Sequence, residues 1–144
     1  MKRPKAKSVL SLDVGKKRIG LAGCDPLGIT VTRLKPLIRK DFESDLNVIN
    51  QLCKNRKVEG LVIGLPFGKS GEKTIQGKFC MEYGLRIANA LNLPIAWVNE
   101  HSSTWQAKAN LKLHSDRSGK IDSEAAGLLL EQWLIEGPEL SLSK

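Results

Sequence analysis

Three acidic residues stand at the ends of predicted elements, where carboxylates can act together on a metal ion. Asp13 ends an apolar run, Glu100 follows a second run, and Asp122 heads the apolar stripe of the last predicted helix. Carboxylates brought close together repel one another unless divalent cations neutralise them. Oxygen ligands of this kind favour Mg²⁺ or Mn²⁺. The sequence therefore predicts a site for one or two such ions at Asp13, Glu100 and Asp122.

Two ions roughly 3.5–4 Å apart can activate water and stabilise the leaving oxygen of a phosphodiester. The chemistry expected of this site is thus metal-dependent hydrolysis of a phosphodiester bond.

Each acid also has a simpler interpretation. Asp13 with Gly15 is compatible with an ordinary hairpin turn, because Asp and Gly are frequent turn residues. Asp122 is compatible with a helix cap. However, Ser123 could cap instead, and the spacing of Asp122, Ala126 and Leu129 aligns the acid with the buried face.

The elements that must position these acids alternate between strand and helix patterns. A meander of three strands is followed by helix, strand, helix, strand and two further helices, which predicts an α/β fold with a mixed five-stranded sheet. If the first and fifth strands are adjacent and parallel, Asp13 and Glu100 lie at equivalent edges. The expected strands occupy about 9–12, 19–22, 29–34, 58–65 and 94–99, and the expected helices about 41–56, 75–91, a segment capped by Ser102 or Ser103, and 122–136.

The composition favours one cytoplasmic domain over residues 1–144, with a basic flexible tail at 1–7 and a C-terminal tail at 138–144. The sequence has neither a membrane-length apolar run nor a secretory signal pattern. Cys24, Cys53 and Cys80 are dispersed, which favours reduced thiols in the core.

Positive charge is concentrated at the N-terminal side. Residues 1–40 hold eleven Lys and Arg against two acids, a net of +9, whereas residues 41–144 hold twelve against thirteen, a net of −1. Localised positive charge favours a polyanion such as nucleic acid, although the basic tail alone could serve only solubility. The predicted nucleic-acid contacts are Lys16, Lys17 and Arg18 in the first turn, and Lys69, Lys73, Arg117 and Lys120 in two later loops.

Four motifs, collinear over about residues 8–136, resemble the pre-16S rRNA nuclease family, also called the YqgF-type or Holliday junction resolvase-like family. The motifs are Asp13-Val-Gly-Lys-Lys-Arg-Ile-Gly20, the Val62–Pro66 strand with Gly71, Asn99-Glu100 with Ser103-Thr104, and Ile121-Asp122-Ser-Glu-Ala-Ala126.

The resemblance implies a ribonuclease-H-like three-layer fold, with helices on both faces of the sheet. It also implies a cytoplasmic metal-dependent nuclease that trims the 5′ end of precursor 16S rRNA, with catalytic roles for Asp13, Glu100 and Asp122. His101 stands where the family commonly has Arg. An imidazole holds a phosphate weakly at neutral pH, so the rate or the substrate preference can differ.

The resulting hypothesis is a single-domain hydrolase for RNA that acts as a monomer or homodimer, with ribosomal particles as a further partner. Two alternatives stay open: a resolvase for branched DNA, which a two-fold dimer would favour, and a non-catalytic RNA-binding factor in ribosome assembly. An ATPase of the actin-like class is disfavoured, because it needs two such domains.

Overall fold

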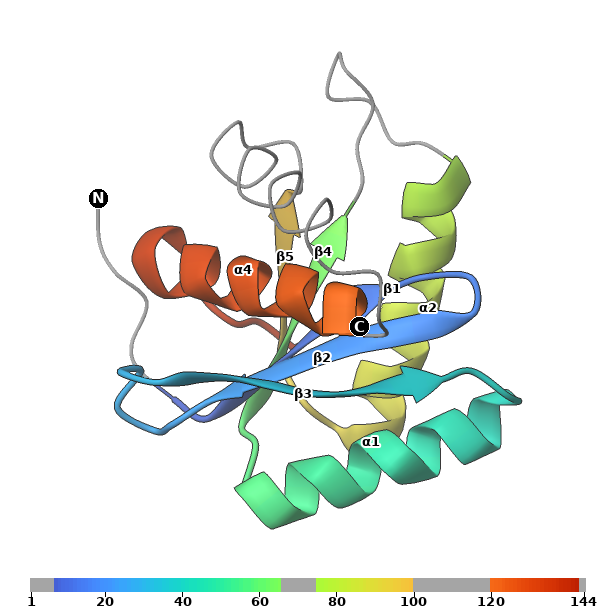
Figure 1. Cartoon of the computed structure of the whole chain (residues 1–144), viewed down its shortest axis with the longest axis horizontal. Coiled ribbons are helices and arrows are strands. Elements are labelled where there is room, and N and C mark those ends of the chain that lie inside the picture. Colours follow the sequence, from blue (N-terminus) through green and yellow to red (C-terminus); the bar gives the residue numbers. More distant parts are fainter. Residues whose placement is uncertain (1–6, 66–74, 100–119, 143–144) are drawn as a thin grey trace.

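The computed structural model describes residues 7–65, 75–99 and 120–142, without the side chains of Gln76 and of residues 120–122. Five strands form one sheet in the order β3-β2-β1-β4-β5 (Figure 1). The elements are β1 (Val9–Val14), β2 (Arg18–Cys24), β3 (Val31–Ile38), α1 (Phe42–Arg56), β4 (Gly60–Leu65), α2 (Ile75–Leu91), β5 (Ile95–Asn99) and α4 (Lys120–Glu136).

The sheet is mixed, as the sequence predicts. β1 pairs antiparallel with β2, and β2 pairs antiparallel with β3. β1, β4 and β5 run parallel, in a register that aligns Leu12 with Ile63 and Ile63 with Trp97. The first and fifth strands are therefore parallel but not adjacent, because β4 lies between them. The condition that they be adjacent is thus not met, but the condition that they be parallel is, and their carboxyl ends share one edge.

Helices cover both faces of the sheet (Figure 1). Leu10, Leu12 and Val14 of β1 join the core beneath α1 and α2, whereas Val9 belongs to the core beneath α4. This alternation follows from the two-residue period of a strand. All six residues of β4 are buried, which explains its nearly continuous apolar sequence.

The ends of two helices follow from local chemistry. Asp41 caps α1, and its Oδ1 accepts a hydrogen bond of 2.8 Å from the backbone N–H of Ser44. At the other end of the chain α4 stops before Gly137, whose φ of +78° suits glycine, and Pro138 follows. The predicted boundaries of both helices are confirmed to within two residues.

β3 extends further than its apolar run predicts. It continues to Ile38 through Pro36, because β3 is an edge strand and an edge tolerates a residue that lacks a backbone N–H. The segment predicted as a C-terminal tail is partly docked: Ser141 exchanges two backbone hydrogen bonds with Ile95, of 2.8 and 3.0 Å.

The three cysteines are buried and form no disulfide, as the sequence predicts. Burial raises the pKa of the Cys53 thiol to about 11. Among the described residues, no helix is both long enough and apolar enough to cross a bilayer.

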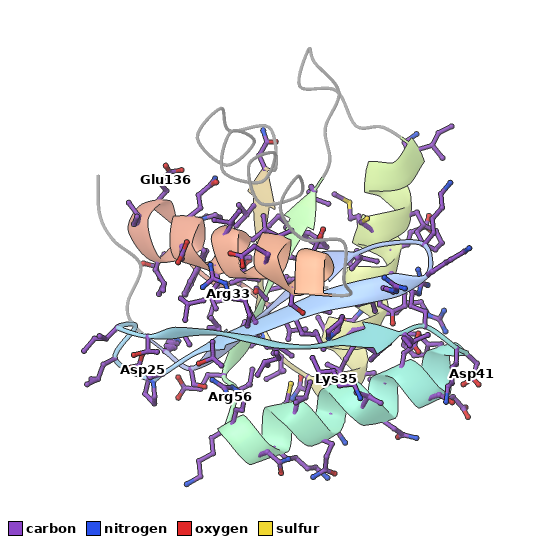
Figure 2. All side chains as sticks on the ribbon, viewed as in Figure 1. Asp25, Arg33, Lys35, Asp41, Arg56 and Glu136 are labelled. Atoms are coloured by element: carbon purple, nitrogen blue, oxygen red, sulfur yellow. The ribbon has the colours of Figure 1, made fainter. Side chains whose placement is uncertain are left out.

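Polar contacts tie α4 to the strands beneath it. Arg33 of β3, which is labelled beside α4 in Figure 2, donates to Glu124 Oε1 from Nε at 3.1 Å and from Nη2 at 2.8 Å. Ser123 Oγ donates to the Leu34 carbonyl of β3, and Ser11 Oγ donates to the Ala126 carbonyl at 2.7 Å. Together they set where the first turn of α4 sits on the sheet.

Candidate functional site

Asp13 is the next-to-last residue of β1, where it is half-buried and pairs with Gly20 of β2. The predicted strand ends one residue before it, whereas the structure includes Asp13 and Val14. Ser11 lies two residues earlier and faces α4, as its hydrogen bond to Ala126 shows. By strand alternation Asp13 lies on the same face, beside the amino-terminal part of α4.

The first turn of α4 lies toward the β1–β2 turn (Figure 1). Asp122 precedes Ala126 by four residues, about one helical turn. Asp13 follows Ser11 by two strand residues, about 6–7 Å. From the Ser11–Ala126 contact, the path along β1 to Asp13 and the path along α4 back to Asp122 run in the same direction. The backbone positions of Asp13 and Asp122 thus lie at the same end of the β1–α4 contact.

Ser123, the alternative cap residue, is buried and donates to the Leu34 carbonyl. In this contact its hydroxyl ties α4 to β3. Ala126, Leu129 and Trp133 are each at most 1% exposed, which confirms that the stripe headed by Asp122 faces the sheet.

The remaining predicted ligand lies beyond the described residues. β5 ends at Asn99, and Glu100 is the next residue in the sequence. Because β1, β4 and β5 are parallel and in register, β5 ends at the same sheet edge as β1. Within the part of the chain that the structure describes, no three His, Cys, Asp or Glu side chains are grouped as a metal site, and that part excludes Glu100 and the Asp122 side chain.

The β1–β2 turn carries three predicted nucleic-acid contacts. Lys16, Lys17 and Arg18 are all exposed. The Gly15 N–H donates to the Arg18 carbonyl at 2.9 Å, and a Cβ at Gly15 would lie 2.8 Å from that oxygen. Glycine is thus required for the tight closure of this turn. Residues 15–18 are called the basic turn below.

Arg39 holds the basic turn from the end of β3. Its Nη1 donates to the Gly15 carbonyl at 2.8 Å, and its backbone N–H donates to the Lys17 carbonyl at 2.8 Å. The backbone of the basic turn is therefore fixed at two points while its cationic side chains remain exposed.

Arg39 is supported in turn by a buried polar cluster that sequence reasoning missed. Asp45 of α1 is 2% exposed and accepts from Tyr83 Oη at 3.0 Å and from the Lys40 N–H at 3.0 Å. Arg39 Nε lies 3.9 Å from Asp45 Oδ2, and the guanidinium stacks 4.5 Å from the Tyr83 ring centroid. The sequence signal for this cluster is an acid, Asp45, at a position of α1 that faces the core, because a buried carboxylate needs a polar or cationic partner.

Burial raises the pKa of the Tyr83 hydroxyl well above its ordinary value, and the Asp45 carboxylate raises it further. Tyr83 thus remains a hydrogen-bond donor to Asp45 at neutral pH.

The side chains of the other predicted contacts lie outside the described residues. Lys69, Lys73 and Arg117 lie outside the described residues, and so does the helix expected after Ser102 or Ser103. Lys120 is the first residue of α4, and its side chain is outside the described set.

Solved structures support the fold. The Thermus thermophilus RuvC structure in complex with Holliday junction substrate matches with a TM-score of 0.57 at 14% identity, covering 85% of this chain and 91% of RuvC. A second T. thermophilus RuvC structure matches with a TM-score of 0.51 at 12% identity, covering 85% and 92%. At this identity the match concerns the fold alone, and the predicted ribonuclease-H-like fold is confirmed.

Curated relatives are much closer in sequence. A protein of Prochlorococcus marinus (strain MIT 9211) named "Putative pre-16S rRNA nuclease" is 60% identical over 139 residues, which are 96% of each chain. A protein of the same name from Parasynechococcus marenigrum (strain WH8102) is 62% identical over 137 residues, 95% of this chain and 87% of the relative. Residues 7–136 match the RuvX family, described as Holliday junction resolvase. The chain therefore belongs to the RuvX family, and it is a nuclease with a ribonuclease-H-like fold.

Proposed function

We propose that this nuclease is metal-dependent and processes the 5′ end of precursor 16S rRNA, with Asp13, Glu100 and Asp122 as the metal-binding carboxylates. The observation that carries the proposal is the contact between Ser11 and Ala126, which sets Asp13 of β1 and the Asp122 position of α4 at one end of the same interface. Glu100 follows β5, whose end lies at the same sheet edge.

The donor set suits a hard divalent cation. Asp13 offers carboxylate oxygens from a half-buried position, and two further carboxylates would complete a site rich in negative charge. One or two Mg²⁺ or Mn²⁺ ions held there would supply an activated water and stabilise the leaving oxygen.

The cationic residues would position the substrate. Lys16, Lys17 and Arg18 would bind backbone phosphates, which sets the register of the nucleic acid without reading its bases. Lys69, Lys73, Arg117 and Lys120 are proposed as further phosphate contacts. These interactions need no base sequence, so specificity would arise from the shape of the substrate.

The substrate assignment follows the names of the relatives, which are 60% and 62% identical to this chain. These names suggest precursor rRNA as the substrate. We further propose that the protein acts in the cytoplasm, on ribosomal particles, as a monomer or homodimer. A branched DNA junction is the second candidate, because the family is described as Holliday junction resolvase and RuvC is solved with such a junction.

The Asp13→Asn variant tests the catalytic proposal. With Mn²⁺ and a precursor 16S rRNA fragment, we expect cleavage to fall more than about 100-fold, since changes in the second shell of metal sites alone cost 10–100-fold. RNA binding should persist, because the basic turn is unchanged. Asp25→Asn is the matched control, since Asp25 lies in the β2–β3 turn and accepts from three backbone N–H groups there.

Equal cleavage by Asp13→Asn and the wild-type protein would contradict the metal-site assignment. Cleavage of a four-way DNA junction by the wild-type protein is compared with cleavage of the precursor 16S rRNA fragment. The preferred substrate is the one that is cleaved at the lower enzyme concentration.

A further inference from the structure

A pocket of about 450 Å³ lies beside the basic turn, and part of its wall comes from α2, which is on the opposite sheet face from α4. Its lining combines four cationic residues with two apolar ones, and it includes no carboxylate among the described residues. The lining residues are Lys16, Lys17, Ile38, Arg39, Lys40 and Phe79. We call it the Phe79 pocket.

Phe79 presents an aromatic surface to this pocket. It lies in the second turn of α2 and is 43% exposed, although large apolar side chains are usually buried. The Arg39 guanidinium carbon lies 5.1 Å from the Phe79 ring centroid. Arg39 is itself held by Gly15 and lies against Tyr83, so the ring has a fixed cationic neighbour.

Two cations of the pocket, Lys16 and Lys17, are available to an anion. In the described part of the chain the ion pairs involve Arg33 and Arg39, and none involves Lys16 or Lys17. The first turn of α2 also contains no acidic residue.

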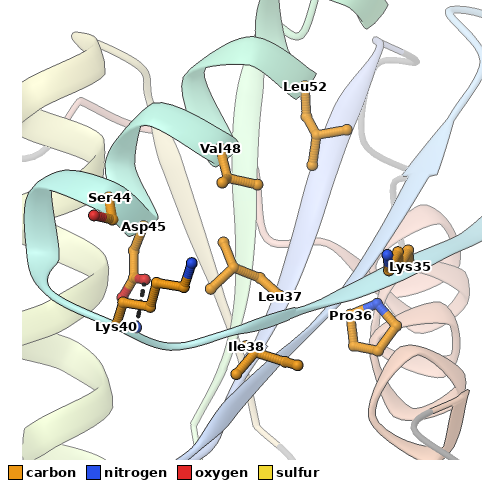
Figure 3. Close-up of a pocket in the computed structure, with 9 residues that line it drawn as sticks. All are labelled: Lys35, Pro36, Leu37, Ile38, Lys40, Ser44, Asp45, Val48 and Leu52. Carbon is orange, nitrogen blue, oxygen red and sulfur yellow. Dashed lines mark hydrogen bonds between the residues drawn. The ribbon is translucent and has the colours of Figure 1, made fainter.

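Lys40 is placed differently. Its backbone N–H donates to Asp45, and the residue also borders an apolar groove between β3 and α1 (Figure 3). Of the cations that line the Phe79 pocket, Lys16 and Lys17 are therefore the best placed to contact a phosphate group of a bound nucleic acid.

The pocket adjoins the end of β1 that carries Asp13. Cys80, the neighbour of Phe79, contacts the Val14 carbonyl through Sγ at 3.4 Å, and Val14 directly follows Asp13. A nucleic-acid strand that passes over the basic turn can thus contact both the Asp13 edge and the Phe79 pocket.

We infer that the Phe79 pocket binds one unpaired nucleotide of the substrate, with its base stacked on Phe79 and its phosphate against Lys16 and Lys17. The inference rests on the proposed nuclease function. An exposed aromatic ring beside cations is the combination that binds single-stranded nucleic acid, because every base has a face that can stack. A paired base within a duplex has its faces covered by its neighbours. The pocket would therefore favour substrates with an unpaired segment next to the cut.

The test compares the binding of a labelled single-stranded 12-nucleotide RNA with that of a blunt RNA duplex of the same length, in EDTA so that no cleavage occurs. Phe79→Leu keeps apolar bulk but removes the ring, and we expect single-strand affinity to fall about tenfold while duplex affinity is unchanged. Phe79→Tyr should restore affinity to within about twofold. Ile135→Ala is the control, since Ile135 is an exposed apolar residue on α4.

Unchanged single-strand affinity in Phe79→Leu would overturn the inference, and so would an equal loss for the duplex. A thermal melt of each variant verifies folding, and the tyrosine variant supplies a second reading if the leucine variant is unstable. Because binding is measured without metal, the two proposals can be tested separately. The Phe79 variants can show no effect while Asp13→Asn still abolishes cleavage, and Asp13→Asn can cleave normally while the Phe79 variants lose single-strand affinity.

Discussion

At the residue scale, the buried carboxylate of Asp45 determines how the basic turn is held. An ionised group that is 2% exposed is costly unless hydrogen bonds and a cation compensate it. Tyr83, the Lys40 N–H and Arg39 supply these partners. The compensated acid keeps Arg39 beneath Gly15, and so the structural residue Asp45 supports the proposed binding residues.

Replacing Tyr83 by Phe removes one hydrogen bond to this charge. We expect the free energy of unfolding at pH 7 to fall by about 1.5–3 kcal/mol, the usual contribution of a hydrogen bond to a charged group. Urea denaturation measures the change. Phe42 packs edge-on against the Tyr83 ring, with ring centroids 6.0 Å apart. The phenyl ring of the variant keeps this contact, so the change in stability reports the loss of the hydrogen bond.

The same residue predicts a pH dependence. An unfolded tyrosine ionises near pH 10, whereas burial and Asp45 raise the pKa of folded Tyr83 above that value. The contribution of the Tyr83 hydroxyl to the free energy of unfolding is therefore complete below about pH 10. It is lost as the pH rises further, because Tyr83 loses its proton at a lower pH in the unfolded state than in the folded state. Tyr83 is the one tyrosine in the chain, so tyrosinate absorbance titrates it directly. Ionisation near pH 10 in the folded protein would contradict the buried hydrogen bond.

At the element scale, α4 approaches β3 closely because residue 127 has no side chain. A Cβ at Gly127 would lie 2.6 Å from Arg33 Nε, so the arginine crosses the helix where the glycine leaves space. From there Arg33 reaches Glu124 at 2.8 Å and Glu131 at 3.5 Å. This packing places the helix that carries Asp122 on the sheet.

A double-mutant cycle between Gly127→Ala and Arg33→Ala tests this packing. Alone, Gly127→Ala should change stability by less than about 0.5 kcal/mol, because a helix-propensity gain of about 1 kcal/mol is offset by displacement of Arg33. With Arg33→Ala already present, the same change should stabilise the protein by up to about 1 kcal/mol. Purely additive effects in thermal or urea unfolding would show that the two residues do not compete for space.

At the scale of the whole molecule, charge is distributed unevenly over the fold. Residues 1–40 carry a net of +9, and the described part of this segment forms β1, β2, β3 and the basic turn. Antiparallel pairing of β2 with β3 brings Arg18 opposite Ile38, next to Arg39 and Lys40. Cations that are separated by about twenty residues in sequence therefore gather at one end of the sheet, where a polyanion can contact them together.

This arrangement predicts a strong and local salt dependence. Lys16→Gln with Lys17→Gln should lower the slope of log affinity against log salt for single-stranded RNA by about 1.4, since each phosphate contact contributes about 0.7. Lys54→Gln with Lys57→Gln removes the same charge from the far end of α1 and should leave the slope nearly unchanged. Equal slopes for both double variants would mean that net charge, rather than the basic turn, drives binding.

Much of the fold was predictable from the sequence because its signals are local. Apolar runs identified all five strands, and the Gly137-Pro138 stop defined the end of the last helix, whereas Asp41 was not recognised as the cap of α1. The end of β3 was missed because Pro36 resembles a terminator unless the strand is known to be at an edge.

The tertiary structure alone decided the rest, because partners far apart in sequence leave no periodic signal. It inserted β4 between β1 and β5, seated α4 through the Ser11–Ala126 contact, and brought Arg39 to Phe79 and Tyr83. By itself the sequence determined that Asp13 stands near the end of a strand beside a cationic turn, since residue type and spacing are properties of one segment. Which side chains surround that turn depends on how separate segments pack, and only the folded chain specifies that.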